Sequence, residues 1–267
     1  FDNVLRNAVS YSTPGGQVYT LAFNNGTYSN GEESIFANNK ALRQAICYSI
    51  NKEDVVALAI DNSAPPLYTP FPNFIANYPA DFDGNVYNLD EAKAKLAEAG
   101  YADGLTVTIK TTTQSGYTKP AEAVMGQVQN IGVTMELEQL ERGTYLQEVY
   151  NNFDYDCTIW AVSCDYPNMD SGAYRRFYSG NIGPANNYMQ INDPELDDAI
   201  MTNRTTTDAA EQAECVLRVC EIIRDESYCL PLYAAMTNLA ANADLEGVNV
   251  NYGSVVDFST WSWADAE

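Results

Sequence analysis

The sequence predicts an α/β domain, because strand-like and helix-like segments alternate along the middle of the chain. Positions 105–111, 133–140 and 155–162 are rich in β-branched or alternating apolar residues, which is typical of strands. Apolar residues at helical spacing fill positions 121–131, and a short helical segment at 144–152 precedes the third strand. The order strand, helix, strand, helix, strand indicates crossover connections within one sheet.

The first part of the chain predicts one strand and two capped helices. Residues 1–37 are expected to be irregular or extended, with an alternating stretch at 18–25 that suits a strand. Asn38 or Asn39 precedes the first helix, and Asn51 precedes the second. An asparagine side chain at this position accepts hydrogen bonds from the free amides of the first helical turn.

A proline-rich loop follows and leads into further helices. Residues 63–79 contain five of the eleven prolines together with several aromatic residues, so this loop either packs over the core or forms a binding rim. Asn88 caps the next helix, and Gly100 provides its left-handed stop. The chain is then expected to close with two helices and a strand, at 194–203, 208–224 and 229–241.

Composition indicates a folded, strongly acidic protein. The chain has 267 residues, of which 46% are hydrophobic, so it is long enough for a substantial core in one large or two small domains. Its net charge of −22 repels phosphate backbones and anionic membranes, so we expect no nucleic-acid partner. No apolar run reaches the ~20 residues of a membrane span. Because Phe1 follows no leader, we expect a mature form or a fragment.

Most catalytic chemistry is disfavoured by what the sequence lacks. The chain has no histidine, which removes most metal sites and the usual serine or cysteine triads. The acidic pairs Glu32/Glu33 and Asp197/Asp198 lie in loop or surface-helix contexts, where carboxylates are normally solvated. Residues 81–92 resemble a calcium loop, but the glycine is misplaced and no glutamate ends the loop. We therefore expect no enzymatic activity, no metal and no cofactor.

The six cysteines do not form a metal-binding pattern. Their spacings are unlike those of zinc sites, and buried single thiols are the expected state, although disulfides stay open in an oxidising compartment. The cysteines are Cys47, Cys157, Cys164, Cys215, Cys220 and Cys229.

The end of the third strand carries an unusual group of polar residues. An apolar run ends at Ser163, Cys164 and Asp165, and Tyr166 begins a turn. These residues either cap the strand or form part of a ligand site, because ligands of α/β domains sit where strands leave the sheet. From the residues alone, both interpretations stay open.

Six segments in chain order carry a resemblance to one family. The chain resembles the extracellular solute-binding proteins of the dipeptide and oligopeptide type (family 5), which deliver ligands to ABC importers. The segments are NKALRQAICYSINKEDVV, NLDEAKAKLAEAGYADGLTVTIK, GQVQNIGVTMEL, WAVSCDYPNMD, INDPELDDAI and CEIIRDESYCLPLY.

The resemblance implies one lobe of a two-lobed, periplasmic-binding-protein-like (type II) fold, with a mixed sheet flanked by helices. It implies a crossover segment at 1–30, a C-terminal ligand-binding lobe at 31–240 and a return crossover at 241–267. It further implies a monomer that captures peptides or other small solutes and delivers them to the permease subunits of an ABC transporter. Such a protein is held outside the cytoplasmic membrane, and we expect a lipid anchor on a segment absent from this chain.

The resemblance also assigns roles at the end of the third strand. Asp165 is expected to bind the ligand's α-ammonium group, and the backbone before it to pair with an extended peptide. Ser163 and Cys164 would offer main-chain hydrogen bonds, and Tyr166 would line the pocket. The remaining candidate ligand-binding residues depart from the family pattern, because Val162 replaces a frequent tryptophan and Asn168 a frequent aspartate.

Three alternatives remain from the sequence. The same scaffold could bind nickel chelates, oligosaccharides or another solute. It could also serve as a peptide-responsive receptor or a peptide chaperone. A hydrolase is the third alternative, and the missing histidine and nucleophile motif argue against it.

Overall fold

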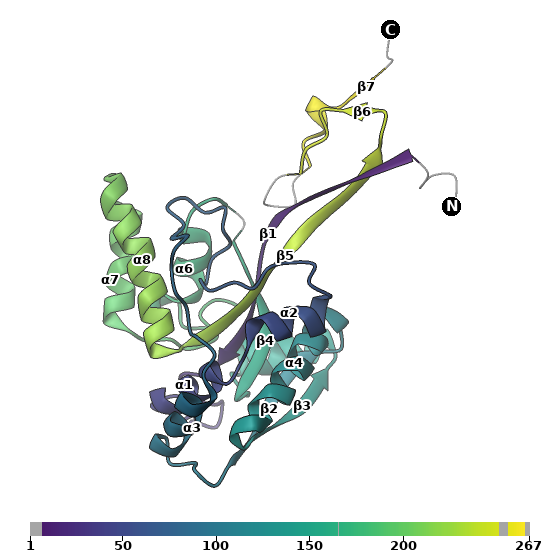
Figure 1. Cartoon of the computed structure of the whole chain (residues 1–267). Coiled ribbons are helices and arrows are strands. Elements are labelled where there is room, and N and C mark those ends of the chain that lie inside the picture. The colour runs from purple at the N-terminus through teal and green to yellow at the C-terminus, as the bar shows by residue number, and fades with distance from the viewer. Residues whose placement is uncertain (1–6, 165, 251–255, 265–267) are drawn as a thin grey trace.

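One mixed sheet organises the chain (Figure 1). The computed structural model describes residues 7–164, 166–250 and 256–264. The three strands in the order β3-β2-β4 run parallel, and β1 runs antiparallel to β4 and to β5. The strands are β1 (Ala8–Phe23), β2 (Leu105–Thr112), β3 (Val133–Leu140), β4 (Cys157–Ser163) and β5 (Cys229–Asn242). The expected mixed sheet flanked by helices is confirmed.

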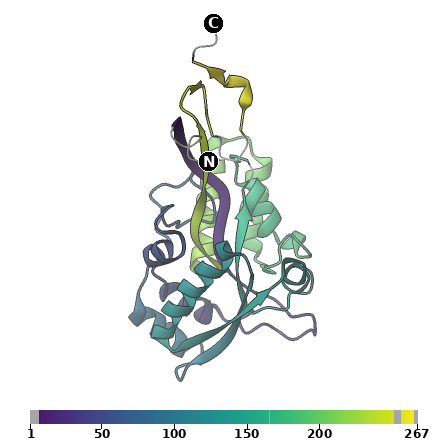
Figure 2. The same ribbon diagram turned by 90° about the vertical axis from the view of Figure 1, so that its right-hand side faces the viewer.

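Helices cover both faces of the sheet, as the turned view shows (Figure 2). Side chains alternate between two buried clusters, so that Leu21 and Ile159 face one core while Ala22 and Trp160 face the other. The first core is covered by α1 (Lys40–Tyr48), α2 (Lys52–Ile60), α3 (Leu89–Glu98) and α4 (Ser115–Val128). The second is covered by α5 (Arg142–Tyr145), the π-helix η3 (Leu146–Asn151), α6 (Asp170–Arg176), α7 (Pro194–Thr205) and α8 (Ala209–Glu226).

The predicted helix caps are present. Asn39 accepts from the Leu42 amide, Asn51 from the Asp54 amide and Asn88 from two amides of the first turn. Of the two candidates for the first cap, Asn39 is therefore the correct one. Gly100 has a φ of +92° directly after α3, as a left-handed helix stop requires.

Two elements differ from the expectation. The strand expected at 18–25 is the inner half of a much longer strand, β1, which begins at Ala8. Its outer half is exposed and pairs with the distal half of β5 in a two-stranded ribbon that projects from the body (Figures 1 and 2). The short helix α6 also follows the turn after β4, where the sequence predicted no helix. Neither element has a strong local pattern, because the outer half of β1 is largely exposed and α6 is only seven residues long.

The ribbon leads to a small antiparallel pair, β6 (Leu245–Glu246) and β7 (Ser262–Trp263). Three 3-10 turns complete the described elements, namely η2 (Gln129–Ile131), η4 (Ser179–Asn181) and η5 (Phe258–Thr260). Within the described part of the chain, no helix is both long and apolar enough to cross a membrane.

The proline-rich loop packs over the sheet and reaches the turn after β4. The Leu67 amide donates to the Leu232 carbonyl at 2.9 Å, and Phe71 is fully buried in the second core. The Ala76 amide donates to the Pro167 carbonyl at 3.0 Å. From α2, the buried Lys52 ammonium donates to the Leu67 carbonyl at 2.9 Å. The loop therefore covers the core and also supports the turn that follows β4.

The six cysteines are buried, as expected, and the thiols of Cys47, Cys157, Cys215, Cys220 and Cys229 are free. Burial raises the pKa of the Cys47 thiol to about 12 and also raises the pKa of Cys157, Cys220 and Cys229. Burial shifts the pKa of Lys52 in the opposite direction and lowers it to about 8.

These buried thiols predict a loss of stability at alkaline pH. An unfolded thiol titrates near pH 8.5, so above that pH the unfolded chain releases protons that the folded chain keeps. Each such thiol should lower the free energy of unfolding by about 1.4 kcal/mol between pH 7.5 and pH 9.5. In the same range Lys52 acts in the opposite sense, but one lysine is outweighed by several thiols.

Denaturant unfolding at both pH values, in reductant, tests this expectation. Cys47→Ala should flatten the pH dependence by about 1.4 kcal/mol. The control Ser49→Ala, which truncates another buried polar residue at the end of α1, should leave the pH dependence unchanged. An equally steep loss in Cys47→Ala would contradict the assignment.

Candidate functional site

The connections of the sheet change sides between β2 and β4. The connection from β2 to β3 contains α4 on one face, whereas the connection from β3 to β4 contains α5 and η3 on the other face. In open α/β sheets, ligands bind at such a switch point, outside the carboxyl ends of the strands. The carboxyl ends of β2 and β4 are Thr112 and Ser163.

The two strands separate before they reach this edge. Their ladder contains only the pairs Ile109–Cys157 and Lys110–Thr158. Beyond it, β2 continues to Thr112 and stays paired with β3, while β4 continues to Ser163 and stays paired with β1. We call the space between these separating ends the β2–β4 crevice.

The outer part of β4 turns hydrogen-bonding groups toward this crevice. The Cys164 amide donates to the Gly16 carbonyl at 2.7 Å, and the Asn24 amide donates to the Asp156 carbonyl at 3.0 Å. These two bonds show which residues of β4 direct their amide and carbonyl groups toward β1, because in an antiparallel pair every second residue does so. In that alternation, the amide and carbonyl groups of Ala161 and Ser163 point away from β1, toward the side that β2 has left. This stretch of β4 is therefore a short open strand edge, the kind that pairs with an added extended segment.

Aromatic rings fill the inner end of the crevice. Tyr117, in the first turn of α4, stacks on Trp160 of β4 with ring centroids 5.0 Å apart and also contacts Tyr19 of β1 at 5.4 Å. Since Tyr19 and Trp160 lie on opposite faces of the sheet, the Tyr117 ring passes through the gap between β2 and β4. The stack continues from Trp160 to the buried Tyr145 and from Tyr19 to Tyr233, each at about 5 Å.

The tyrosines of the inner crevice are partly shielded from water. Burial raises the pKa of Tyr19 to about 12, and the neighbouring Tyr117 adds to this shift. Burial also raises the pKa of Tyr117, although Tyr19 and Arg142 partly offset it. Both phenols are therefore neutral at physiological pH, and the rings offer stacking surface and hydroxyl groups rather than charge.

The residues predicted at the end of β4 have different surroundings. Ser163 is half-buried at the crevice, and Val162 is buried on the face that also carries Val18 and Leu67. The Cys164 thiol is buried and its amide is already bonded to β1, whereas the backbone amide and carbonyl of Ser163 face the crevice.

Beyond the strand, Tyr166 is 65% exposed, so its ring is available to line a pocket only at the surface. The Asn168 side chain accepts from the Ser171 amide at 3.2 Å, which holds the start of α6. The proposed ammonium anchor, Asp165, lies outside the described residues. The roles predicted for these residues therefore stay predictions.

Sequence reasoning missed the aromatic part of the crevice. The sequence predicts Trp160 only as part of a strand and gives Tyr117 and Tyr19 no particular role. Their local patterns belong to a helix start and to strands, and nothing in the sequence indicates that the rings meet. The one available signal was the high content of tyrosine, 19 residues in the chain.

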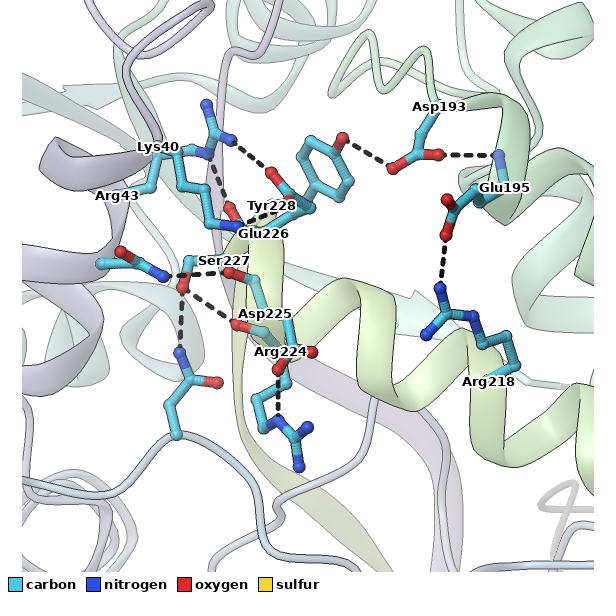
Figure 3. Close-up of polar contacts among 12 residues, drawn as sticks. Lys40, Arg43, Asp193, Glu195, Arg218, Arg224, Asp225, Glu226, Ser227 and Tyr228 are labelled. Atoms are coloured by element: carbon cyan, nitrogen blue, oxygen red, sulfur yellow. Dashed lines mark hydrogen bonds and ion pairs between the residues drawn. The ribbon is translucent and has the colours of Figure 1, made fainter.

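A second concentration of polar residues lies at the opposite end of the sheet, where β5 begins (Figure 3). The Lys40 ammonium contacts the Glu226 carboxylate at 2.6 Å, and the Arg43 Nε donates to the Glu226 carbonyl at 3.1 Å. The Tyr228 hydroxyl donates to Asp193 at 2.9 Å. A hollow of about 540 Å³ lies beside this polar cluster, but the charged and hydroxyl groups of the cluster are already bonded to one another. We interpret the cluster as a structural connection between α1, α8 and β5.

No metal centre is apparent among the described residues, because none of their cysteine, aspartate and glutamate side chains form a group of three that could hold an ion. The described geometry thus offers an open strand edge and an aromatic crevice, and both suit an extended organic ligand.

Comparison with known proteins identifies the family. Residues 2–184 match the model of the bacterial extracellular solute-binding proteins, family 5 Middle. The chain belongs to this family. Among curated relatives, the oligopeptide-binding protein AppA of Bacillus subtilis (strain 168) is 24% identical over 234 residues, which are 81% of this chain and 42% of AppA.

Solved structures share the fold. HbpA2 from Haemophilus parasuis superposes with a TM-score of 0.84 at 20% identity, over 98% of this chain and 51% of that one. The periplasmic binding protein DppA from Helicobacter pylori gives a TM-score of 0.81 at 22% identity, over 98% of this chain and 50% of that one. The chain therefore has the periplasmic-binding-protein fold, and it spans about half the length of the proteins that it matches.

The crevice stack predicts a specific effect of Tyr117→Ala. Removing the ring exposes Trp160, which is 9% exposed in the intact protein, so its fluorescence emission should move to longer wavelength. The free energy of unfolding should fall by about 1–3 kcal/mol through lost ring contacts and burial. Tyr117→Phe, which keeps the ring, is the matched control and should preserve both properties. Trp160→Phe identifies which part of the emission comes from Trp160. If that part is unchanged in Tyr117→Ala, the stacking is disproved.

Proposed function

We propose that this chain is one lobe of the substrate-binding component of an ABC importer that captures peptides. The open edge of β4 at the β2–β4 crevice is the observation that carries the proposal. An extended peptide placed there can pair with the amide and carbonyl groups of Ala161 and Ser163, as an added strand does. Relatives support this ligand class, since the structures of AppA and DppA were determined in complex with a nonapeptide and with the peptide STSA.

The α-ammonium group of the peptide would meet Asp165, directly after the open edge. A carboxylate and an ammonium in a closed, partly dry cleft form a charge-assisted hydrogen bond of about 1.5–3 kcal/mol. The aromatic rings of Tyr117 and Tyr19 would line the same cleft without adding charge. This arrangement fixes the direction of the peptide by its amine and leaves its side chains less constrained.

The second lobe would be supplied by the remainder of a longer protein. The chain spans about half of its relatives, and the β1–β5 ribbon carries exposed apolar residues such as Val9, Phe258 and Trp263 at or near its far end. We assign 1–30 and 241–267 to the crossovers and 31–240 to this lobe, with the inner half of β1 completing its sheet. Ligand would bridge the two lobes, and the closed form would dock on the permease.

The remaining properties follow the same assignment. The protein would act outside the cytoplasmic membrane as a monomer, held by a lipid anchor on a segment outside this chain. It would bind and release its ligand without catalysis. Relatives also include a heme-binding protein A of Haemophilus influenzae and glutathione-binding proteins, so these two ligands belong in any binding assay.

The ammonium anchor predicts a loss of affinity in Asp165→Asn. In the intact two-lobed protein, peptide affinity should fall about 10- to 150-fold, and N-acetylation of the peptide should produce a similar loss in the wild type. Calorimetry with di-, tri- and longer peptides would measure both effects. The matched control is Asp170→Asn, which removes a neighbouring carboxylate that pairs with Arg204 on the surface and should leave affinity unchanged.

The possible outcomes separate the alternatives. Equal affinity of Asp165→Asn and the wild type would remove the anchor while leaving peptide binding intact. Binding of heme, nickel chelates or oligosaccharides, with no binding of any peptide, would overturn the proposed ligand class.

A further inference from the structure

Three neighbouring side chains in or beside the second core each carry a buried polar atom with no hydrogen-bond partner within 3.5 Å among the described residues. These atoms are Nε of Arg176 and the hydroxyl oxygens of Tyr150 and Tyr188. The two tyrosine rings stack with centroids 4.5 Å apart, and the Arg176 guanidinium carbon lies 5.9 and 5.8 Å from them. Buried polar groups are normally satisfied, and a cluster of three exceptions indicates a missing partner.

Arg176 is also a buried cation without a counter-ion. Its side chain is 6% exposed, and its Nη1 donates to the carbonyl oxygens of Ala185 and Asn186 at 2.9 and 3.1 Å. Within the described residues, Arg176 forms no ion pair, although most other arginines of this acidic chain do. Two carbonyl oxygens hydrogen-bond the guanidinium but do not neutralise it, so the positive charge stays costly in the core.

Among the described residues, no carboxylate affects the pKa of Tyr150 or Tyr188. The groups that shift the pKa of Tyr150 upward or downward are Tyr188, Arg176, Tyr145 and Tyr155, besides burial itself. The available groups are therefore one fixed cationic donor and two neutral hydroxyls that can rotate to donate. A set of donors around a positive charge favours an anion and excludes a cation.

We propose that Arg176, Tyr150 and Tyr188 hold a small monovalent anion of the halide type, with chloride as the natural occupant. The site is internal, since Tyr150 and Tyr188 belong to the second core and Arg176 is itself buried. A single-atom ion suits such a position better than sulfate or phosphate does. It would satisfy the three orphaned donors and neutralise the guanidinium at the same time.

The anion would connect three segments directly behind the candidate binding site. Arg176 ends α6, Tyr150 belongs to η3, and Tyr188 lies in the loop before α7. Tyr150 contacts Trp160 edge-on at 5.2 Å, and Trp160 forms the wall of the β2–β4 crevice. The site is thus a structural support for the crevice, and it does not depend on which ligand the crevice binds.

Thermal unfolding of this chain in matched sodium salts tests the proposal. Against sodium gluconate of equal ionic strength, 0.2 M sodium chloride or bromide should raise the midpoint by about 2–4 °C in a saturable manner. Arg176→Met should abolish this halide dependence. The adjacent Arg175→Met, at an exposed position, is the matched control and should retain it.

Bromide diffraction provides a second measurement that does not depend on a variant folding. Crystals of the wild type grown in sodium bromide should show an anomalous peak in contact with Arg176 Nε and both hydroxyls, and Tyr188→Phe should weaken it. An ordinary water molecule at this position, together with a midpoint that is the same in halide and gluconate, would overturn the proposal. A halide shift that persists in Arg176→Met would also overturn it.

Discussion

The structure depends on the backbone hydrogen bonds that β4 forms with its two neighbouring strands, β1 and β2. Along its inner half, β4 bonds to β1 on one side and to β2 on the other, and both cores are built on this continuous sheet. After two residue pairs, β2 leaves β4 and follows β3. The separation occurs where the two connections lie on opposite faces of the sheet, with α4 on one face and the α5–η3 segment on the other. The open strand edge and the aromatic crevice both follow from it.

Several contacts around the crevice stabilise the separated ends of β2 and β4. Tyr117 occupies the gap and links Tyr19 to Trp160, so that the two faces of the sheet stay joined where backbone bonds are missing. The proline-rich loop braces the turn beyond β4 through Ala76 and Pro167, and the Lys52 ammonium braces the loop. Burying the Lys52 ammonium is costly, and its pKa is accordingly lowered to about 8.

Much of the wider architecture could be predicted from the chain. The alternation of strand and helix patterns, the asparagine caps at Asn39, Asn51 and Asn88, and six family-like segments in order all pointed to the fold that is observed. These signals are local, since a cap or an amphipathic face is written within about one helical turn or a few alternating residues. The outer half of β1 and the helix α6 were missed because exposed residues and tertiary neighbours, rather than local pattern, determine them.

By itself, the sequence determined the class of fold, the family, the buried state of the cysteines and the strand end at which a ligand was to be sought. Only the tertiary structure decided which groups are available there: the Cys164 amide is used by β1, whereas the Ser163 backbone faces the crevice. It also decided that Tyr19, Tyr117 and Trp160 form one stack, and that Arg176 is buried beside two unpaired hydroxyls. The physical reason is that strand register and the contacts between distant segments depend on how the whole chain packs, and no local pattern encodes them.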